Sequence, residues 1–309
     1  MSEPSKQVSP MGVAADPMED IAVESARRLA WRRAVFRFRQ SSLSMLGLAM
    51  VLAVLFVAVF GSALAPFPEH IAGGVDTGNR FMPPSLAHPF GTNELGQDVL
   101  SLVMAGTRVS VLAGLGIVLI ATVLGTVIGA VAGFFGGWLD EVLMRISDLQ
   151  LTIPGLIFAM AVAAALGAGL FNMVIAISLG WWPGFARLVR GEVLAKREET
   201  FVVAAYAIGA HPLRILFRHI LPNIISPVIV KMSLDIGFAI LTVASLGFVG
   251  IGVRPPTPEW GTLLSISRSY MPDFWWTAVF PGLAMFFAIF GFNLLGDGLR
   301  DVLDPRARR

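Results

Sequence analysis

Long stretches without charged side chains constrain this chain more than any other feature of its sequence. Between Asp148 and Arg187 lie 38 residues without a charge. A single helix of that length would be about 57 Å long, whereas the hydrocarbon core of a membrane is about 30 Å thick. The stretch must therefore fold back on itself, and the run Gly167-Ala168-Gly169 predicts the turn.

Further uncharged stretches are long and apolar enough to cross a membrane. They lie between Arg39 and Glu69, between Arg108 and Asp140, from about Ile224 to Gly252, and between Asp273 and Asp297. With the two spans of the folded-back stretch, they predict six transmembrane helices. Composition agrees, because only 14% of the residues are charged, against roughly 25% in soluble domains. We therefore expect an all-α integral membrane protein.

Lysine and arginine are divided unequally between the two sides that these spans define. Nineteen lie on the side of both termini and four on the other, namely Arg80, Arg108, Arg254 and Arg268. Because cytoplasmic segments carry the excess of positive charge, both termini are expected in the cytoplasm, in agreement with an even number of spans. The first apolar run has no cleavage site after it, which predicts an uncleaved anchor.

The N-terminal segment is polar and basic. Residues 1–20 contain three prolines and are expected to be disordered, whereas residues 20–40 mix six arginines with aromatic and aliphatic side chains. That mixture is typical of a helix lying on the inner membrane surface and held by anionic lipid. A positive flank that only sets the topology explains the same composition, so both interpretations stay open.

Several kinds of chemistry are absent from the sequence. There is no cysteine, which excludes disulfides, thiolate metal sites and a cysteine nucleophile. There is also no GxxxxGK[ST], HExxH or GxSxG motif. A net charge of +2 does not predict a nucleic-acid-binding surface. The chain is therefore expected to be non-catalytic, with no metal or cofactor of its own and no nucleic-acid partner.

Two features within the spans concern packing and charge. Glycines recur every four residues from Gly125 to Gly137, which predicts a narrow face for close helix packing. Asp235 is the acidic residue expected within a span, and such a charge is a functional candidate. Lys231 lies one helical turn earlier, so we favour a local ion pair near the inner boundary.

The cytoplasmic segment 186–223 is too long for a simple connection. Its sequence predicts a helix ended by Gly209, a turn through Pro212, and a second helix that ends before Pro222. The first helix carries a small apolar face at helical spacing, formed by Phe201, Ala204, Ala205 and Ile208. Either a partner protein covers this face or the face packs on its own bundle.

This segment resembles the EAA loop of ABC importer permeases. The resemblance lies in Ala204-Ala205, Gly209 and the later Leu221-Pro222, although Val203 stands where that loop has Glu and His219 where it has a hydrophobic residue. Three further blocks, residues 88–100, 255–261 and 292–306, resemble the C-type permease subunit of peptide/nickel importers, which include the dipeptide and oligopeptide transporters. The resemblance covers residues from about 40 to 306.

The resemblance implies a type I ABC importer permease (MetI-like) architecture in a bacterial inner membrane. It implies a heterodimer with a homologous second permease, two ABC ATPase subunits that bind ATP and Mg²⁺, and an external solute-binding protein, either periplasmic or a lipoprotein. The expected organisation is a basic tail (1–40), a first span with a long external loop (41–106), a five-helix core that includes the loop 186–223 (107–299), and a cytoplasmic tail (300–309).

The resemblance also suggests site residues. The residues expected to face the ATPase are Phe201, Ala204, Ala205, Gly209, His211, Pro212, Arg214 and Arg218. In the external loops, Glu94, Asp98, Glu259 and Trp260 are candidates for contacting the binding protein or gating entry. The alternative is that prolines and tryptophan fix these loops on the bundle.

The expected function is ATP-driven import of dipeptides or oligopeptides, in which closure of the ATPases drives alternating access. The same architecture also imports nickel, glutathione or murein-derived peptides, and the sequence does not distinguish these cargoes. An ion-coupled carrier without ATPase subunits and a structural membrane anchor are the alternatives from other classes. A carrier is expected to bury more polar groups, and an anchor leaves the segment 186–223 unexplained.

Overall fold

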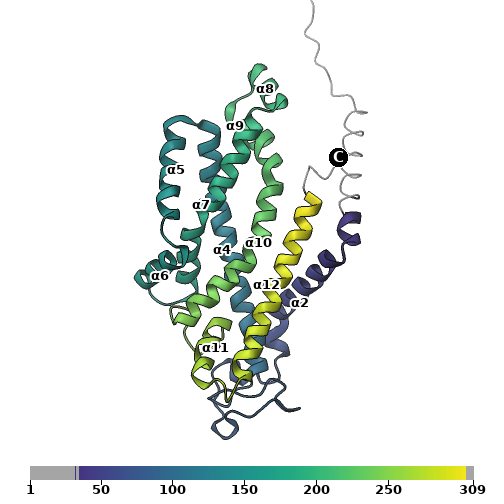
Figure 1. Ribbon diagram of the computed structural model, residues 1–309, viewed down its shortest axis with the longest axis vertical. Coiled ribbons are helices and arrows are strands. Elements are labelled where there is room, and N and C mark those ends of the chain that lie inside the picture. The colour runs from purple at the N-terminus through teal and green to yellow at the C-terminus, as the bar shows by residue number, and fades with distance from the viewer. Residues whose placement is uncertain (1–31, 33–34, 304–309) are drawn as a thin grey trace, which may run out of the picture.

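The computed structural model describes residues 32 and 35–303 (Figure 1). Within these ranges the chain forms helices and loops, and the β-type pairing there is a single bridge between Thr92 and Asp98. The expectations for residues 1–20, for most of the basic segment 20–40 and for the end of the C-terminal tail lie outside the described residues. Val35–Gln40 is helical.

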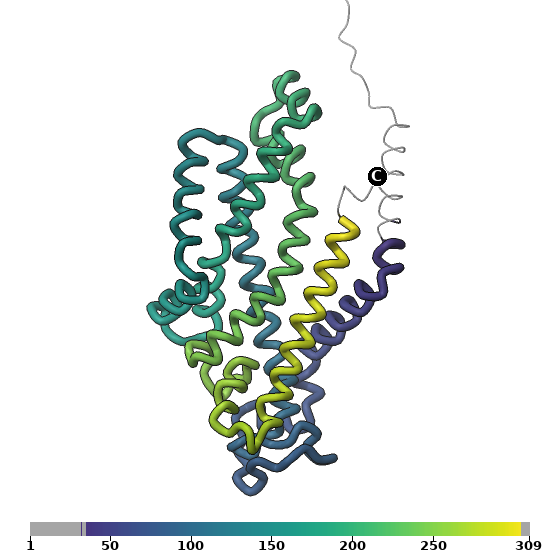
Figure 2. Tube along the Cα trace, viewed as in Figure 1, coloured from purple at the N-terminus to yellow at the C-terminus, as the bar shows by residue number. Residues whose placement is uncertain are grey.

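The largest helices run along the long axis of the molecule, as the trace in Figure 2 shows. They are α2 (Ser42–Leu64), α4 (Val99–Phe135), α7 (Leu170–Arg197), α10 (Leu221–Val249) and α12 (Trp276–Leu303). In the described part of the chain, four helices are long and apolar enough to cross a membrane: α2, α4, α10 with the turns before it, and α12.

A bent pair of shorter helices makes a fifth candidate span. Helices α5 (Gly137–Leu151) and α6 (Gly155–Leu166) meet at 91° across the break Thr152–Pro154. The chain then turns back as expected, because α6 ends at Gly167 with φ +87° and α7 follows Gly169. The predicted fold-back and its position are therefore confirmed.

The predicted number of six spans is only partly supported. The sixth would be α7, which is 28 residues long but less apolar, because Asn172, Pro183 and Arg187 interrupt its sequence. By length and composition the described residues give four spans, or five with the bent pair. The sixth span and the cytoplasmic position of the termini stay predictions.

The predicted glycine face packs α4 against α7. A Cβ on Gly129 would lie 2.3 Å from the carbonyl oxygen of Ala186, and one on Gly125 would lie 2.6 Å from that of Trp182. Gly133 approaches α7 in the same way. Gly137 does not belong to this face, because α4 ends before it and it begins α5 with φ +58°. Small residues thus let the two backbones touch.

Apolar layers join the remaining helices. Fully buried Ile117, Ile177 and Val243 bring α4, α7 and α10 together. On the other side of α4, buried Val54 of α2 and Phe292 of α12 belong to a second cluster. Because lipid is as apolar as these side chains, close packing rather than exclusion of water holds such helices together in a membrane.

The two ends of the bundle carry the irregular segments (Figure 1). At one end lie α8 (Thr200–Ala207) and α9 (Pro212–Ile215), followed by a π-helical turn (Leu216–Ile220) that leads into α10. The other end holds the long loop before α4 and the segment between α10 and α12. These contain α3 (Pro68–Ile71), 3-10 turns at Thr77–Asn79 and Arg268–Tyr270, and α11 (Trp260–Ser267).

Candidate functional site

The segment between α7 and α10 is a compact helix–turn–helix, which we call the coupling segment (residues 198–220). Helix α8 ends at Ala207, and Gly209 follows with φ +76°. The amide of Gly209 donates to the Tyr206 carbonyl at 3.0 Å, and the amide of Ala210 donates to that of Ala205 at 3.1 Å. Because this left-handed turn favours glycine, Gly209 ends the helix as predicted.

Two details of the predicted helices are wrong. The first helix is not continuous, because α7 ends at Arg197 and Glu199 is extended (φ −70°, ψ 141°) before α8 begins. The second helix does not end before Pro222. Through the π-helical turn it continues into α10, where Pro222 occupies the first turn. The π-helical turn directly precedes Pro222, at the point where proline removes one N–H donor from the helical hydrogen bonds.

One side of the coupling segment packs on its own bundle. Val202 of α8 and Ile215 of α9 are fully buried, and Ala205 is nearly so. They belong to one apolar cluster with Phe134 of α4 and Val193 of α7. This packing anchors the segment on two long helices.

The opposite side is open. Ile208 is 84% exposed, and Phe201 and Ala204 are also exposed. The hollow on this side measures about 470 Å³ and is lined by Phe201, Ala204, Ala205, Ile208, Ala210, Arg214, Arg218 and His219. Of the predicted apolar face, Ala205 thus packs on the bundle, whereas Phe201, Ala204 and Ile208 stay open. A partner protein that covers them stays a prediction.

Positive charge borders the hollow. Arg214 and Arg218 are exposed, and neither forms an ion pair among the residues that the structure describes. His211 and Pro212 are exposed at the start of α9 and do not line the hollow. Five of the eight predicted residues therefore line this hollow, namely Phe201, Ala204, Ala205, Arg214 and Arg218. Gly209 forms the turn that follows α8. An apolar side chain flanked by carboxylates would complement the surface.

Polar contacts that the sequence analysis missed fix the base of the segment. Arg190 of α7 binds Asp140 of α5 through two contacts of 2.5 and 2.7 Å, and Arg197 donates to the Gly133 carbonyl of α4 at 3.0 Å. Bidentate Arg–carboxylate pairs fix orientation as well as distance. Asp140 and Arg190 each follow a predicted span and lie on the same predicted side of the membrane. Opposite charges placed in this way are the sequence signal for the pair.

The charged pair within α10 forms as predicted. Lys231 Nζ lies 2.8 Å from Asp235 Oδ2, one helical turn away, and 4.8 Å from the centre of the Phe185 ring. Both side chains are partly buried. This geometry confirms the local ion pair.

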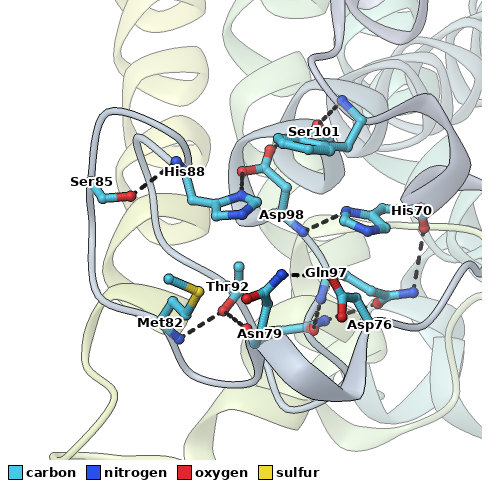
Figure 3. Close-up of polar contacts among 12 residues, drawn as sticks. His70, Asp76, Asn79, Met82, Ser85, His88, Thr92, Gln97, Asp98 and Ser101 are labelled. Atoms are coloured by element: carbon cyan, nitrogen blue, oxygen red, sulfur yellow. Dashed lines mark hydrogen bonds and ion pairs between the residues drawn. The ribbon is translucent and has the colours of Figure 1, made fainter.

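At the other end of the bundle, Asp98 is the centre of a buried polar network (Figure 3). Its Oδ2 accepts from the amide and the hydroxyl of Ser101, both at 2.8 Å, which caps the start of α4. Its Oδ1 lies 3.0 Å from Nδ1 of His88, and its own amide donates to Nδ1 of His70 at 2.9 Å. This one residue joins three parts of the segment from α3 to the start of α4.

Glu259 plays a similar part at the start of α11. Its side chain is fully buried and accepts from the amides of Gly261 and Thr262 at 2.8 and 2.9 Å. The hydroxyl of Ser110 in α4 donates to it at 3.2 Å. Burial raises the pKa of Glu259, and these hydrogen bonds oppose that rise. Trp260 is also buried and donates to the Val103 carbonyl at 3.2 Å.

These positions bear on the expectation for the predicted external loops, and contact with a binding protein or gating of entry stays a prediction. Asp98, Glu259 and Trp260 are buried, so in this conformation they offer no side chain to a docking protein. They cap helices and tie loops to α4, which agrees with the alternative that the loops are fixed on the bundle. Glu94 is partly exposed, and burial raises its pKa against the opposing charge of Arg80. In the described residues, no three His, Asp or Glu side chains gather to hold a metal ion.

Comparison with known proteins gives the family. Residues 125–309 match the family described as binding-protein-dependent transport system inner membrane component. Residues 30–84 match the N-terminal transmembrane domain of oligopeptide transport permease C. A solved structure of the MetNI methionine ABC transporter in inward-facing conformations overlaps with a TM-score of 0.48 at 19% identity, over 62% of this chain and 94% of that chain.

Two curated relatives match nearly the whole chain. The probable D,D-dipeptide transport system permease protein DdpC of Escherichia coli strain K12 is 43% identical over 273 residues, covering 88% of this chain and 91% of that protein. The glutathione transport system permease protein GsiD of Escherichia coli O6:K15:H31 is 43% identical over 281 residues, covering 91% and 92%. The chain therefore belongs to the binding-protein-dependent transport system inner membrane components, as a permease of the C type found in oligopeptide transport.

Proposed function

We propose that this permease serves an ATP-driven importer of short peptides, and that the coupling segment is its contact with an ATP-hydrolysing subunit. The observation that carries the proposal is the asymmetry of that segment. One side is anchored by buried Val202 and Ile215, whereas the other presents exposed Ile208 beside Arg214 and Arg218. An exposed apolar hollow on a firmly held segment is suited to receive a partner.

In this proposal the chain crosses the membrane six times, with α7 as the sixth span and both termini in the cytoplasm. The unequal distribution of lysine and arginine supports this orientation. It puts the coupling segment in the cytoplasm, where ATP is available, and the long loop before α4 outside. The chain itself binds neither ATP nor Mg²⁺ and catalyses no reaction.

The proposed mechanism is a rigid-body movement. When two ATPase subunits close on ATP, they displace the coupling segment, and α7 carries the displacement. The Arg190–Asp140 pair and the contact of Arg197 with Gly133 support this route, because they bind α7 to α4 and α5. A loosely held segment would absorb the displacement before the spans moved.

The proposed assembly contains four further components. They are a homologous second permease that completes the pathway, two ATPases on the cytoplasmic side, and an external solute-binding protein that delivers the cargo. The family description and the presence of a permease C-type N-terminal domain support this assembly in a bacterial inner membrane.

For the cargo we propose short peptides. The relatives' names specify a D,D-dipeptide and glutathione, and both cargoes are small peptides. Nickel and murein-derived peptides are the alternatives within the same architecture.

Reconstitution tests the proposal directly. The complex in proteoliposomes should take up a radiolabelled dipeptide only when ATP, the ATPase subunits and the binding protein are all present. Uptake of glutathione or of ⁶³Ni²⁺ in place of the dipeptide would change the proposed cargo and leave the proposed ATP-driven import intact. Uptake driven by an ion gradient in the absence of the ATPases would contradict the proposal and favour a secondary carrier.

A variant pair tests the coupling segment. Replacing Ile208 by Asp leaves a charge in the hollow, and we expect uptake to fall at least about tenfold because an apolar anchor is lost. Ile208→Leu keeps the apolar surface and should transport normally. Both variants should fold and insert into the membrane, since Ile208 is exposed. Normal uptake by Ile208→Asp would contradict the assigned role.

A further inference from the structure

The external loop contains a compact lobe, residues 82–92, whose two ends meet. The amide of Met82 donates to the Thr92 hydroxyl at 2.8 Å, and the amide of Thr92 donates to the Met82 carbonyl at 3.0 Å. The lobe lies at the end of the bundle opposite to α8 and α9 (Figure 1), and Figure 3 shows the hydrogen bonds of Met82, Ser85, His88 and Thr92. Compact surface loops of this kind are frequently functional.

Hydrogen bonds inside the lobe hold its tip, residues 82–87, in one shape. The amide of Ser85 donates to the His88 carbonyl at 2.9 Å, and the amide of His88 donates to the Ser85 hydroxyl at 3.1 Å. The His88 ring is itself fixed by Asp98 at 3.0 Å and stacks on Phe67 with 4.7 Å between the ring centres. Two consecutive prolines in the tip, Pro83 and Pro84, further restrict the backbone.

The base of the lobe is equally well supported. Phe81 stacks on Phe274 with 3.8 Å between ring centres, and Trp276 donates to the Thr92 carbonyl at 3.1 Å. The lobe therefore stands on the start of α12 as well as on α4. The polar groups and aromatic side chains of the lobe contact the rest of the chain. The apolar side chains of its tip make none of these contacts.

The tip exposes apolar side chains on a rigid frame. Leu86 is fully exposed, and Met82, Pro83, Pro84 and Ala87 are exposed as well. No charged residue occurs between Phe81 and Asn93. Exposed apolar residues elsewhere on this chain lie largely on the long helices, where lipid or other helices can cover them. The tip precedes α4 and is not part of a span, so an apolar patch there is suited to a protein partner.

From this arrangement we propose that the tip is the docking contact for the external solute-binding protein, with Leu86 entering an uncharged apolar pocket on that protein. The inference depends on the proposed function, because the ATPases are assigned to the coupling segment and the opposite end is left for the delivering protein. The family itself requires such a protein, since it is binding-protein-dependent. A preformed tip binds without the cost of ordering a loop.

A positive charge lies near the tip and indicates what the rim of the partner's pocket should carry. Arg80 is exposed at the base of the lobe, and its guanidinium lies 5.9 Å from the centre of the Phe81 ring. An acidic residue at the rim would pair with it and increase the rate of docking. Because Glu94 already lies within reach of the charge of Arg80, the apolar pocket remains the main feature expected of the partner surface.

The test is a titration of the reconstituted complex with the solute-binding protein that co-purifies with it. For Leu86→Asp we expect the binding-protein concentration that gives half-maximal uptake to rise about tenfold or more, with the rate at saturation unchanged. Leu86→Met keeps an apolar side chain and should titrate like the native complex. If Leu86→Asp had the same half-maximal binding-protein concentration as the native complex, the inference would be overturned. A lower uptake rate at saturation with an unchanged half-maximal concentration would overturn it as well.

Chemical labelling gives an independent answer, because the native chain has no cysteine. A single Leu86→Cys residue should react rapidly with a membrane-impermeant maleimide, and saturating binding protein should slow that reaction at least about tenfold. Slow labelling before the protein is added would mean that lipid or the second permease covers the tip, and would overturn the inference. Uptake that needs no binding protein at all would instead contradict the proposed function.

Discussion

The two ends of this permease are held in different ways. The coupling segment rests on its bundle through buried apolar side chains such as Val202 and Ile215, and its polar ties lie at its base in α7. The loop before α4 is built around buried Asp98, whose carboxylate contacts His88 and Ser101 and whose amide donates to His70. Apolar packing leaves one side of the coupling segment free. The polar network instead fixes the conformation of the loop before α4.

This difference predicts different responses to substitution. Truncating a packed side chain removes contacts in proportion to the cavity that remains. Removing a buried charged acceptor leaves several donors unpaired at once. A single substitution at Asp98 should therefore cost more stability than the truncation of one apolar side chain that anchors the coupling segment.

The largest effect is expected for Asp98→Ala. Loss of this buried acceptor should lower the free energy of unfolding by about 3–5 kcal/mol, because His88 and the start of α4 lose their partner. Denaturant unfolding of the purified chain in detergent measures the change. Glu69→Ala is the control, since Glu69 is an exposed acid of the same loop. Equal effects of the two variants would show that the network does not hold the loop.

Ile215→Ala should have the next largest effect. Ile215 is fully buried in the cluster that anchors the coupling segment, and its truncation should cost about 2–4 kcal/mol. Ile208→Ala in the same segment should change stability by less than about 0.5 kcal/mol, because Ile208 is exposed. The same unfolding assay separates them, and a similar cost for both would mean that the segment has no free side.

A smaller effect is expected for Gly209→Ala. The added Cβ meets no atom within 4 Å, so its cost comes from the left-handed backbone alone, about 1–2 kcal/mol. Gly191→Ala is the control, because its Cβ also meets nothing and its backbone is helical. If both variants unfolded alike, the turn at Gly209 would not require glycine.

The smallest effect concerns pH and Glu94. Burial raises the pKa of this carboxyl in the folded chain above its ordinary value, so the folded state holds the proton more tightly than the unfolded state. Its contribution to stability therefore falls as pH rises from the ordinary value through the raised one. Glu94→Gln should remove that slope from the thermal unfolding profile above about pH 4.5, the ordinary value. An unchanged slope would contradict the pKa shift.

The sequence predicts the features that depend on special backbone geometry or on neighbours along one helix. The turn at Gly167, the helix end at Gly209 and the Lys231–Asp235 pair are examples, because their causes lie within a few residues. It did not predict the 91° break before Pro154. A proline next to an apolar run is compatible with a kink, a turn or a helix start, and only the packing of α6 decides between them.

The external sites could not be read from sequence, because their partners are distant. Glu259 is buried by its contact with Ser110, and Trp260 by its contact with Val103, both far earlier in the chain. Acidic residues in a loop are usually exposed, so the sequence alone does not distinguish an acid that caps a helix, such as Glu259, from one that faces a partner. The exposed tip at Leu86 was missed for the opposite reason, because an uncharged loop segment gives no charge pattern to interpret.

The proposed function requires a protein that covers the free side of the coupling segment from the cytoplasm, and one measurement tests this most directly. A single Ile208→Cys residue, in a chain without native cysteine, is labelled with a maleimide in inside-out membrane vesicles before and after the ATPase subunits are added back. We predict rapid labelling of the stripped vesicles and labelling at least about tenfold slower once the ATPases are bound. Equally rapid labelling with the ATPases bound would contradict the account.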